Sequence, residues 1–124
     1  ELASCWDDVE IRLSSTLLKL ECIVGIRRAG TVQNIEPDSK WVKSRLEILN
    51  EYLTEIYFRR VDDDIEEVVR NNSELSDCRT LDAVHVATAL YLKPHLDEPI
   101  TIVSLDNRLR RVAATFGFAL LPEE

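Results

Sequence analysis

The chain has 124 residues, the usual size of a single domain, and it carries a formal charge of −8. Its 45% hydrophobic and 31% charged residues give a globular balance that excludes intrinsic disorder. Because an acidic surface repels phosphate, this charge argues against a protein that grips nucleic acid with a broad basic face, but it leaves room for a carboxylate metal site. We expect one domain spanning residues 1–124.

Cysteine usage and hydropathy indicate a soluble protein of a reducing compartment. The three cysteines are odd in number and show no CxxC spacing, so neither a disulfide framework nor a zinc site is predicted. No apolar run approaches the roughly 20 residues that span a bilayer, and no charged n-region precedes an apolar h-region as in a signal peptide. We therefore expect a cytoplasmic location and no membrane contact.

The first predicted elements are a strand and a helix. Residues 9–14 alternate apolar and polar side chains, the period of a half-buried strand, with Val9 and Ile11 on its inner face. Ser14 and Ser15 then offer N-caps for a helix over 16–29 that ends at Gly30.

Two further helices are predicted in the middle of the chain. Apolar residues keep three-to-four spacing from Trp41 to Ile56, which predicts a long amphipathic helix. A shorter helix follows Val61. Its three leading acids, 62–64, are interpreted as a solvated helix start rather than as metal ligands, and the segment 71–79 is expected to be a polar loop.

The C-terminal part alternates helices and strands. Residues 80–92 are predicted as a helix, 99–105 as a buried parallel strand, 108–117 as a helix capped by Gly117, and 118–121 as a last strand. The order β-α-α-α-α-β-α-β predicts an α/β chain with a thin sheet of three parallel strands joined by helical crossovers.

One acid, Glu21, stands on an apolar helix face. Its helical neighbours include Leu17, Leu18 and Val24, so its carboxylate should be drawn toward the core, where an unpaired charge is costly. An ion pair with Arg28 explains the same spacing equally well.

Two more acids stand at predicted helix starts. Asp82 opens the apolar run TLDAVHVATAL, and Asp106 directly follows the strand TIVSL. Taken alone, Asp82 is better explained as a first-turn acid favoured by the helix dipole, and Asp106 has a similar explanation as an N-cap. As a set with Glu21, however, these carboxylates predict a site for Mg²⁺ or Mn²⁺, and Glu21 and Asp106 follow strand ends, where parallel sheets bind ligands.

Other chemistries have little support. GxSxG, P-loop and GxGxxG motifs are absent. The two histidines lie ten positions apart, without metal-binding spacing, and the cysteines have no activating neighbour and are interpreted as structural.

Three segments together resemble a known family. SSTLLKLECIVGIRR (14–28), TLDAVHVATAL (80–90) and TIVSLDNRLRRVAATFGFALL (101–121) are similar to motifs of PIN-domain ribonucleases of the VapC toxin type. The resemblance covers nearly the whole chain. It implies a PIN-like three-layer α/β/α fold with a parallel sheet.

The resemblance also implies an activity and its residues. Glu21, Asp82 and Asp106 match the acids that bind Mg²⁺ or Mn²⁺ in the family and activate water to hydrolyse an RNA phosphodiester, leaving a 3′-hydroxyl and a 5′-phosphate. Such a metal lowers the pKa of bound water and stabilises charge on phosphoryl oxygens.

Neighbouring residues are assigned supporting roles. Ser104 and Asn107 flank the candidate ligand Asp106 and are expected to position ligands or water. Arg79 and Arg108 are candidates for contacts with RNA phosphates.

The departure from the family is at the start of the chain. PIN domains open with a strand bearing an Asp, and Asp7 and Asp8 come too late to supply it. Either the 124 residues are the C-terminal portion of a longer chain, without the first strand of the sheet, or this form lacks a ligand and a central strand; we expect the first. A chain that truly began at Glu1 is expected to be poorly stable and inactive.

The implied partners are an RNA substrate, such as tRNA or mRNA, a small antitoxin protein and a second copy in a homodimer. The alternative is a catalytically inactive PIN-like module that binds a protein through the same surface.

Overall fold

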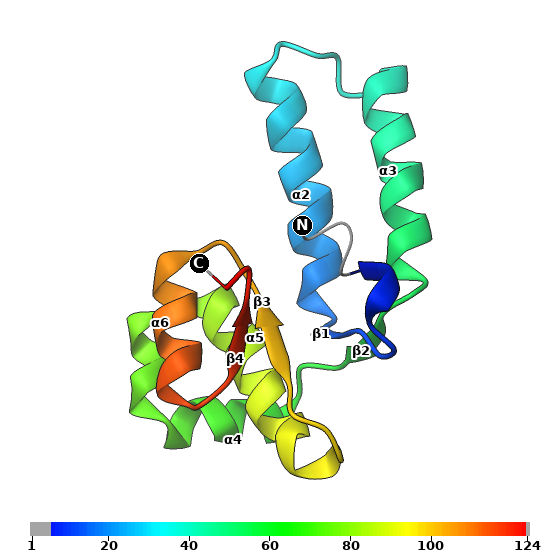
Figure 1. Cartoon of the computed structure of the whole chain (residues 1–124). Coiled ribbons are helices and arrows are strands. Elements are labelled where there is room, and N and C mark those ends of the chain that lie inside the picture. Colours follow the sequence, from blue (N-terminus) through cyan, green and yellow to red (C-terminus); the bar gives the residue numbers. More distant parts are fainter. Residues whose placement is uncertain (1–5, 124) are drawn as a thin grey trace. The chain divides into compact units, whose positions relative to one another are not determined.

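The computed structural model describes residues 6–123, and these divide into two compact units. One unit is Ile11–Arg59; the other runs from Arg60 onward and includes the segment before Ile11. Each is described by itself. The chain is a mixed α/β protein, as expected, and its elements can be followed in Figure 1.

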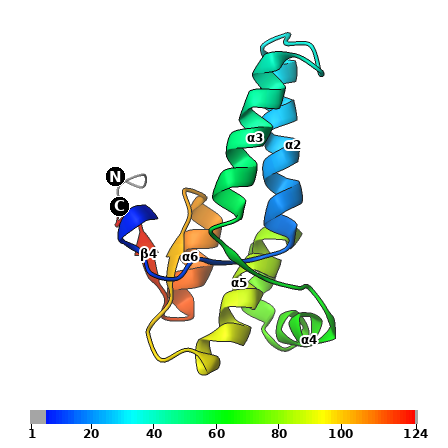
Figure 2. The same ribbon diagram turned by 90° about the vertical axis from the view of Figure 1, so that its right-hand side faces the viewer.

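The unit Ile11–Arg59 is a helical hairpin flanked by two short strands. Its elements in chain order are β1 (Leu13–Ser15), α2 (Leu17–Val32), α3 (Lys40–Leu53) and β2 (Tyr57–Arg59). The two helices run side by side in opposite directions (Figure 2). The two strands pair in parallel, with Ser14 opposite Phe58.

Gly30 lies inside α2 and not at its end. The predicted helix end at Gly30 was wrong by two residues. Gly30 is buried, and an added Cβ would lie 3.4 Å from the Trp41 ring, an ordinary van der Waals distance. The helix closes further on, where Asn34 adopts a positive φ and the Ile35 N–H donates to the Gly30 carbonyl at 2.8 Å.

The first strand differs from its prediction in position and in face. It covers Leu13–Ser15 rather than 9–14, and the side chains expected to face a core, Val9 and Ile11, are exposed. Ser15 instead is fully buried at the end of the strand. Its hydroxyl accepts from the Leu17 N–H at 3.3 Å, so a serine does serve the start of α2, although Thr16 is the N-cap residue.

The unit from Arg60 onward is built around one buried helix. Its elements are α4 (Asp63–Asn71), the 3₁₀ helix η1 (Ser73–Asp77), α5 (Thr80–Leu92), a short 3₁₀ turn η2 (Lys93–His95), β3 (Thr101–Val103), α6 (Asn107–Thr115) and β4 (Ala119–Leu121). β3 and β4 pair in parallel, with Ile102 opposite Leu120.

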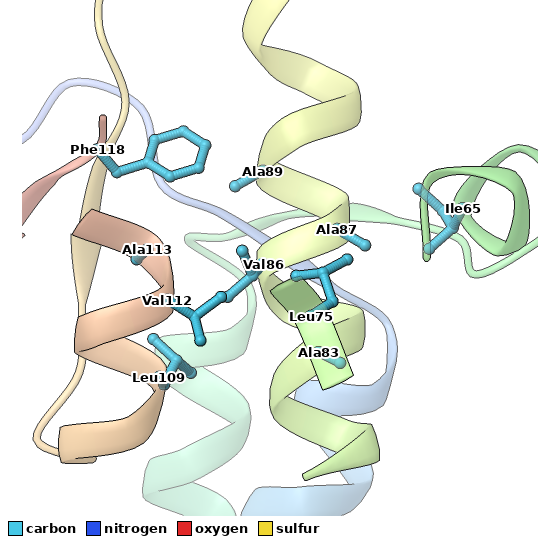
Figure 3. Close-up of a cluster of buried hydrophobic side chains, with 10 residues drawn as sticks. All are labelled: Ile65, Leu75, Ala83, Val86, Ala87, Ala89, Leu109, Val112, Ala113 and Phe118. Atoms are coloured by element: carbon cyan, nitrogen blue, oxygen red, sulfur yellow. The ribbon is translucent and has the colours of Figure 1, made fainter. Parts of the chain in front are cut away.

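The core of this unit lies between α5 and its neighbours. Val86 and Ala87 of α5 are fully buried, and α4, η1, α6 and Phe118 pack around them (Figure 3). Because α5 is apolar around most of its circumference, it is stable only when covered on several sides, which the surrounding elements provide.

Several caps agree with the sequence. α5 covers the predicted residues 80–92, and Gly117 follows α6 with φ of 85°. Asp62 caps α4 by accepting from the Asp64 N–H at 3.1 Å, so the interpretation of the three acids as a helix start is confirmed.

The strand predictions were less accurate. The strand β2 was missed, because a three-residue strand directly after a long helix carries no period of its own. The strands form two separate parallel pairs rather than one thin sheet. β3 was expected to be buried, but only Ile102 turns toward the core, and strand alternation leaves Val103 57% exposed.

Candidate functional site

Asp106 stands between the end of β3 and the start of α6, as its position after TIVSL predicted. It is the N-cap of α6, and its Oδ1 accepts from the Leu109 N–H at 2.9 Å. The prediction that Asp106 is an N-cap is thus confirmed, and the cap uses one of its two carboxylate oxygens. Capping does not exclude metal binding, because a carboxylate offers a second oxygen with further lone pairs.

Two neighbours hold the backbone at Asp106. Ser104 accepts from the Asp106 N–H through its Oγ at 3.1 Å, and its own N–H donates to the Leu121 carbonyl. Arg110 donates to the carbonyls of Ser104 at 2.8 Å and of Pro122 at 2.6 Å, which joins the loop after β3 to the end of β4. The structure therefore gives Ser104 a positioning contact, and it adds Arg110, which the sequence analysis overlooked.

Asp82 lies in the first turn of α5 and is half-buried. It is the third residue of the helix, and the N-cap Arg79 makes no side-chain capping bond. The positive end of the helix dipole favours a carboxylate at this position.

Asp82 and Asp106 both affect the pKa of the Cys78 thiol. Burial raises the pKa of the Cys78 thiol, and the negative charges of Asp82 and Asp106, followed by that of Asp77, raise it further. Two acids separated by 24 positions in the chain therefore act on one sulfur atom. The thiol stays protonated near neutral pH, so it is not prepared to act as a nucleophile or a thiolate ligand.

Glu21 belongs to the other unit and is half-buried on α2. Burial raises the pKa of the adjacent Cys22 thiol, and the charge of Glu21 adds to this shift. The apolar helix face predicted around Glu21 is thus only partly enclosed within its unit.

The carboxylate pair fits a hard divalent cation in the chemistry of its donors. Mg²⁺ commonly takes one or two protein carboxylates and fills its remaining positions with water and substrate phosphates. Within residues 6–123, no three His, Cys, Asp or Glu side chains are grouped closely enough to hold a metal ion by themselves. Asp82 and Asp106 would thus hold such an ion only together with other oxygen ligands.

The remaining predicted residues are exposed at the starts of α5 and α6. Asn107 is the first residue of α6 and is exposed, and Arg79 is exposed at the start of α5. Arg108, also exposed, lines an open hollow together with Arg111, a second arginine that the sequence analysis did not single out. Their three-residue spacing on a helix was the signal that could have linked them.

Comparisons with family models, with curated proteins and with solved structures found no match to this chain. Among the residues that the structure describes, no helix combines the length and the apolar character needed to cross a membrane.

Proposed function

We propose that the chain is a PIN-class, metal-dependent endoribonuclease of the toxin type, with Asp82 and Asp106 as acids of its metal site; the role of Glu21, which belongs to the other unit, stays a prediction from the family resemblance. The proposal rests on one observation above the others: Asp82 and Asp106 stand at the starts of α5 and α6, which pack into one core, and the negative charges of both raise the pKa of the Cys78 thiol. Acids that bind one cation must lie in one region of the fold, and these two belong to the same unit.

The residues have separate tasks in this proposal. A bound Mg²⁺ or Mn²⁺ would supply an activated water and neutralise phosphoryl charge. Asp82 and Asp106 would hold that ion, Ser104 would orient Asp106 through its backbone N–H, and Arg79 or Arg108 would bind RNA phosphate. A PIN-like three-layer fold, a small antitoxin that blocks the carboxylates, a homodimer and a cytoplasmic location belong to the same proposal.

The test is cleavage of a labelled single-stranded RNA by the purified full-length protein in Mg²⁺ or Mn²⁺, with EDTA as the metal-free control. We expect cleavage to leave a 5′-phosphate and to be lost in Asp82→Asn and in Asp106→Asn, with the helical circular dichroism retained. Asp63→Asn is the matched control, because Asp63 is an exposed first-turn acid of α4. Intact cleavage in both site variants would refute the proposal.

A second function, a non-catalytic module that binds a protein, is favoured by a different observation. Asp106 caps its own helix, which gives this acid a structural use without any metal. This alternative predicts that Mn²⁺ leaves the thermal unfolding midpoint unchanged in the wild type and in Asp82→Asn alike. A metal-dependent rise in the wild type that disappears in the variant would exclude it.

A further inference from the structure

An open hollow of about 590 Å³ lies between η1 and α6. We call it the α6 hollow, and it is lined by Ser76, Asp77, Arg108, Arg111, Val112 and Thr115. All six residues belong to one unit of the chain.

Two arginines, Arg108 and Arg111, line the α6 hollow. Within the part of the chain that the structure describes, neither forms a side-chain hydrogen bond or an ion pair. By contrast, Arg110 on the same helix donates to two backbone carbonyls, and Arg70 pairs with Glu66. The two guanidiniums outnumber the one acid of the lining, Asp77, so in a chain of net charge −8 they favour an anionic ligand.

The hydroxyl groups narrow the class of ligand. The Ser76 hydroxyl donates to the Ser73 carbonyl at 2.8 Å, and the Thr115 hydroxyl donates to the Arg111 carbonyl at 3.0 Å. Each has therefore used its only proton and can only accept from a ligand. The α6 hollow thus combines guanidinium forks, which match phosphate oxygens, with acceptors for a ribose 2′-hydroxyl.

The α6 hollow shares an element with one of the candidate carboxylates. Arg108 and Arg111 belong to α6, the helix that Asp106 caps, and Arg111 lies five residues after Asp106, about 7.5 Å further along the helix. On the other wall, Ser76 and Asp77 directly precede Cys78 in the chain. The hollow and both acids thus belong to the same unit.

We propose that the α6 hollow binds a ribose-phosphate unit of single-stranded RNA beside the bond to be cleaved, with Arg108 and Arg111 on the phosphate. This inference rests on the proposed ribonuclease function and extends it to two further residues. Arg111 becomes a binding residue for substrate, and Ser76 and Thr115 select ribose over deoxyribose.

The test measures binding and cleavage separately. Binding of a fluorescein-labelled single-stranded RNA is followed by anisotropy in EDTA over a series of KCl concentrations. We compare the wild type with Arg108→Gln/Arg111→Gln and with the control Arg70→Gln/Lys40→Gln, which removes the same charge from exposed helix positions outside the hollow. Both double variants are checked for retained helical circular dichroism.

We expect the hollow variant to bind RNA at least about tenfold more weakly, because charge-assisted hydrogen bonds to two arginines are lost. Its plot of log affinity against log salt should be shallower by about 1.4, or about 0.7 for each lost phosphate contact. In Mg²⁺ or Mn²⁺, KM should rise while kcat stays close to that of the wild type. The control should match the wild type, and wild-type RNA binding should exceed that of DNA of the same sequence.

Each other outcome overturns a defined part of the inference. If the hollow variant binds and cuts RNA like the wild type while Asp82→Asn is inactive, the hollow is not a substrate site and the ribonuclease proposal stands. If RNA is bound through both arginines but never cut, the proposed function fails. If a labelled polyglutamate peptide binds more strongly than RNA, the ligand of the hollow is an acidic protein and the RNA proposal is wrong. If DNA of the same sequence binds as strongly as RNA, Ser76 and Thr115 do not select ribose.

Discussion

Substitution of Asp106 separates its role as a helix cap from its proposed role as a metal ligand. Asparagine is as good an N-cap as aspartate, so Asp106→Asn should keep the bond from the Leu109 N–H, which is 2.9 Å long in the wild type. It removes the negative charge at the helix N-terminus, an exposed position where that charge contributes about 0.3 to 1 kcal/mol. Asp106→Ala removes the cap as well, at a further cost of about 1 kcal/mol.

The expected pattern therefore has two parts. In urea denaturation, Asp106→Asn should lower the free energy of unfolding by about 0.5 kcal/mol and Asp106→Ala by about 1.5 kcal/mol, the sums of these terms. In the cleavage assay, both variants should lose at least about 100-fold, because removal even of the groups that orient a ligand costs 10- to 100-fold. If Asp106→Asn instead cleaves RNA nearly as well as the wild type and only Asp106→Ala is impaired, activity follows stability. That result would refute the role of Asp106 as a metal ligand and leave its role as a helix cap.

Three further predictions follow from single contacts. Arg110→Met should lower the free energy of unfolding by about 1 to 3 kcal/mol in urea, because two part-buried carbonyls lose a charged donor; an unchanged midpoint would contradict this. Asp82→Asn and Asp106→Asn should each speed the labelling of Cys78 by iodoacetamide at pH 8, measured by peptide mass spectrometry. The negative charges of these acids raise the pKa of the Cys78 thiol, so the removal of either charge lowers that pKa and increases the fraction of reactive thiolate. Equal rates in all three proteins would place the acids away from the sulfur. Gly117→Ala should destabilise by about 1 to 2 kcal/mol because φ is 85° there, and a thermal scan that shows no loss would be inconsistent with that backbone.

Helices were predictable from the sequence because their signals are local and repeated. The apolar run from Thr80 to Leu92 has a defined stop at Lys93-Pro94, and α5 follows it residue for residue. The cap at Asp62 and the positive φ at Gly117 depend on one or two residues each and were predicted for the same reason. Gly30 shows the limit of such reasoning. It was predicted to end its helix, but it lies inside α2 beside the Trp41 ring, which belongs to the next helix.

Strands were predicted poorly because three residues are too few to define a period. Tyr57–Arg59 was assigned no structure, and its pairing with Leu13–Ser15 joins segments more than 40 positions apart. The inner face of the first strand was also assigned wrongly. Alternation at Val9 and Ile11 describes a segment that lies ahead of the strand and is exposed.

The candidate site was predictable in its residue types but not in its grouping. The positions of Asp82 and Asp106 at helix starts can be read directly from the sequence, whereas their common effect on Cys78 arises only once α5, α6 and η1 are packed together. The hollow that Arg108 and Arg111 form with Ser76 also depends on tertiary packing. Ser76 belongs to η1, which lies in a segment expected to be a polar loop.

The cap and the ligand explanations of these acids describe compatible uses of one side chain. The Leu109 N–H holds one oxygen of Asp106, and the Ser104 hydroxyl holds its backbone, so the second oxygen is carried by a side chain whose orientation is already fixed. The N-termini of α5 and α6 each carry a partial positive charge, which interacts favourably with the carboxylates of Asp82 and Asp106. A cation that binds these acids must therefore compete with the two helix dipoles for them. The residue pattern that builds a good cap is thus the same pattern that presents a carboxylate, and spacing alone could not separate the two.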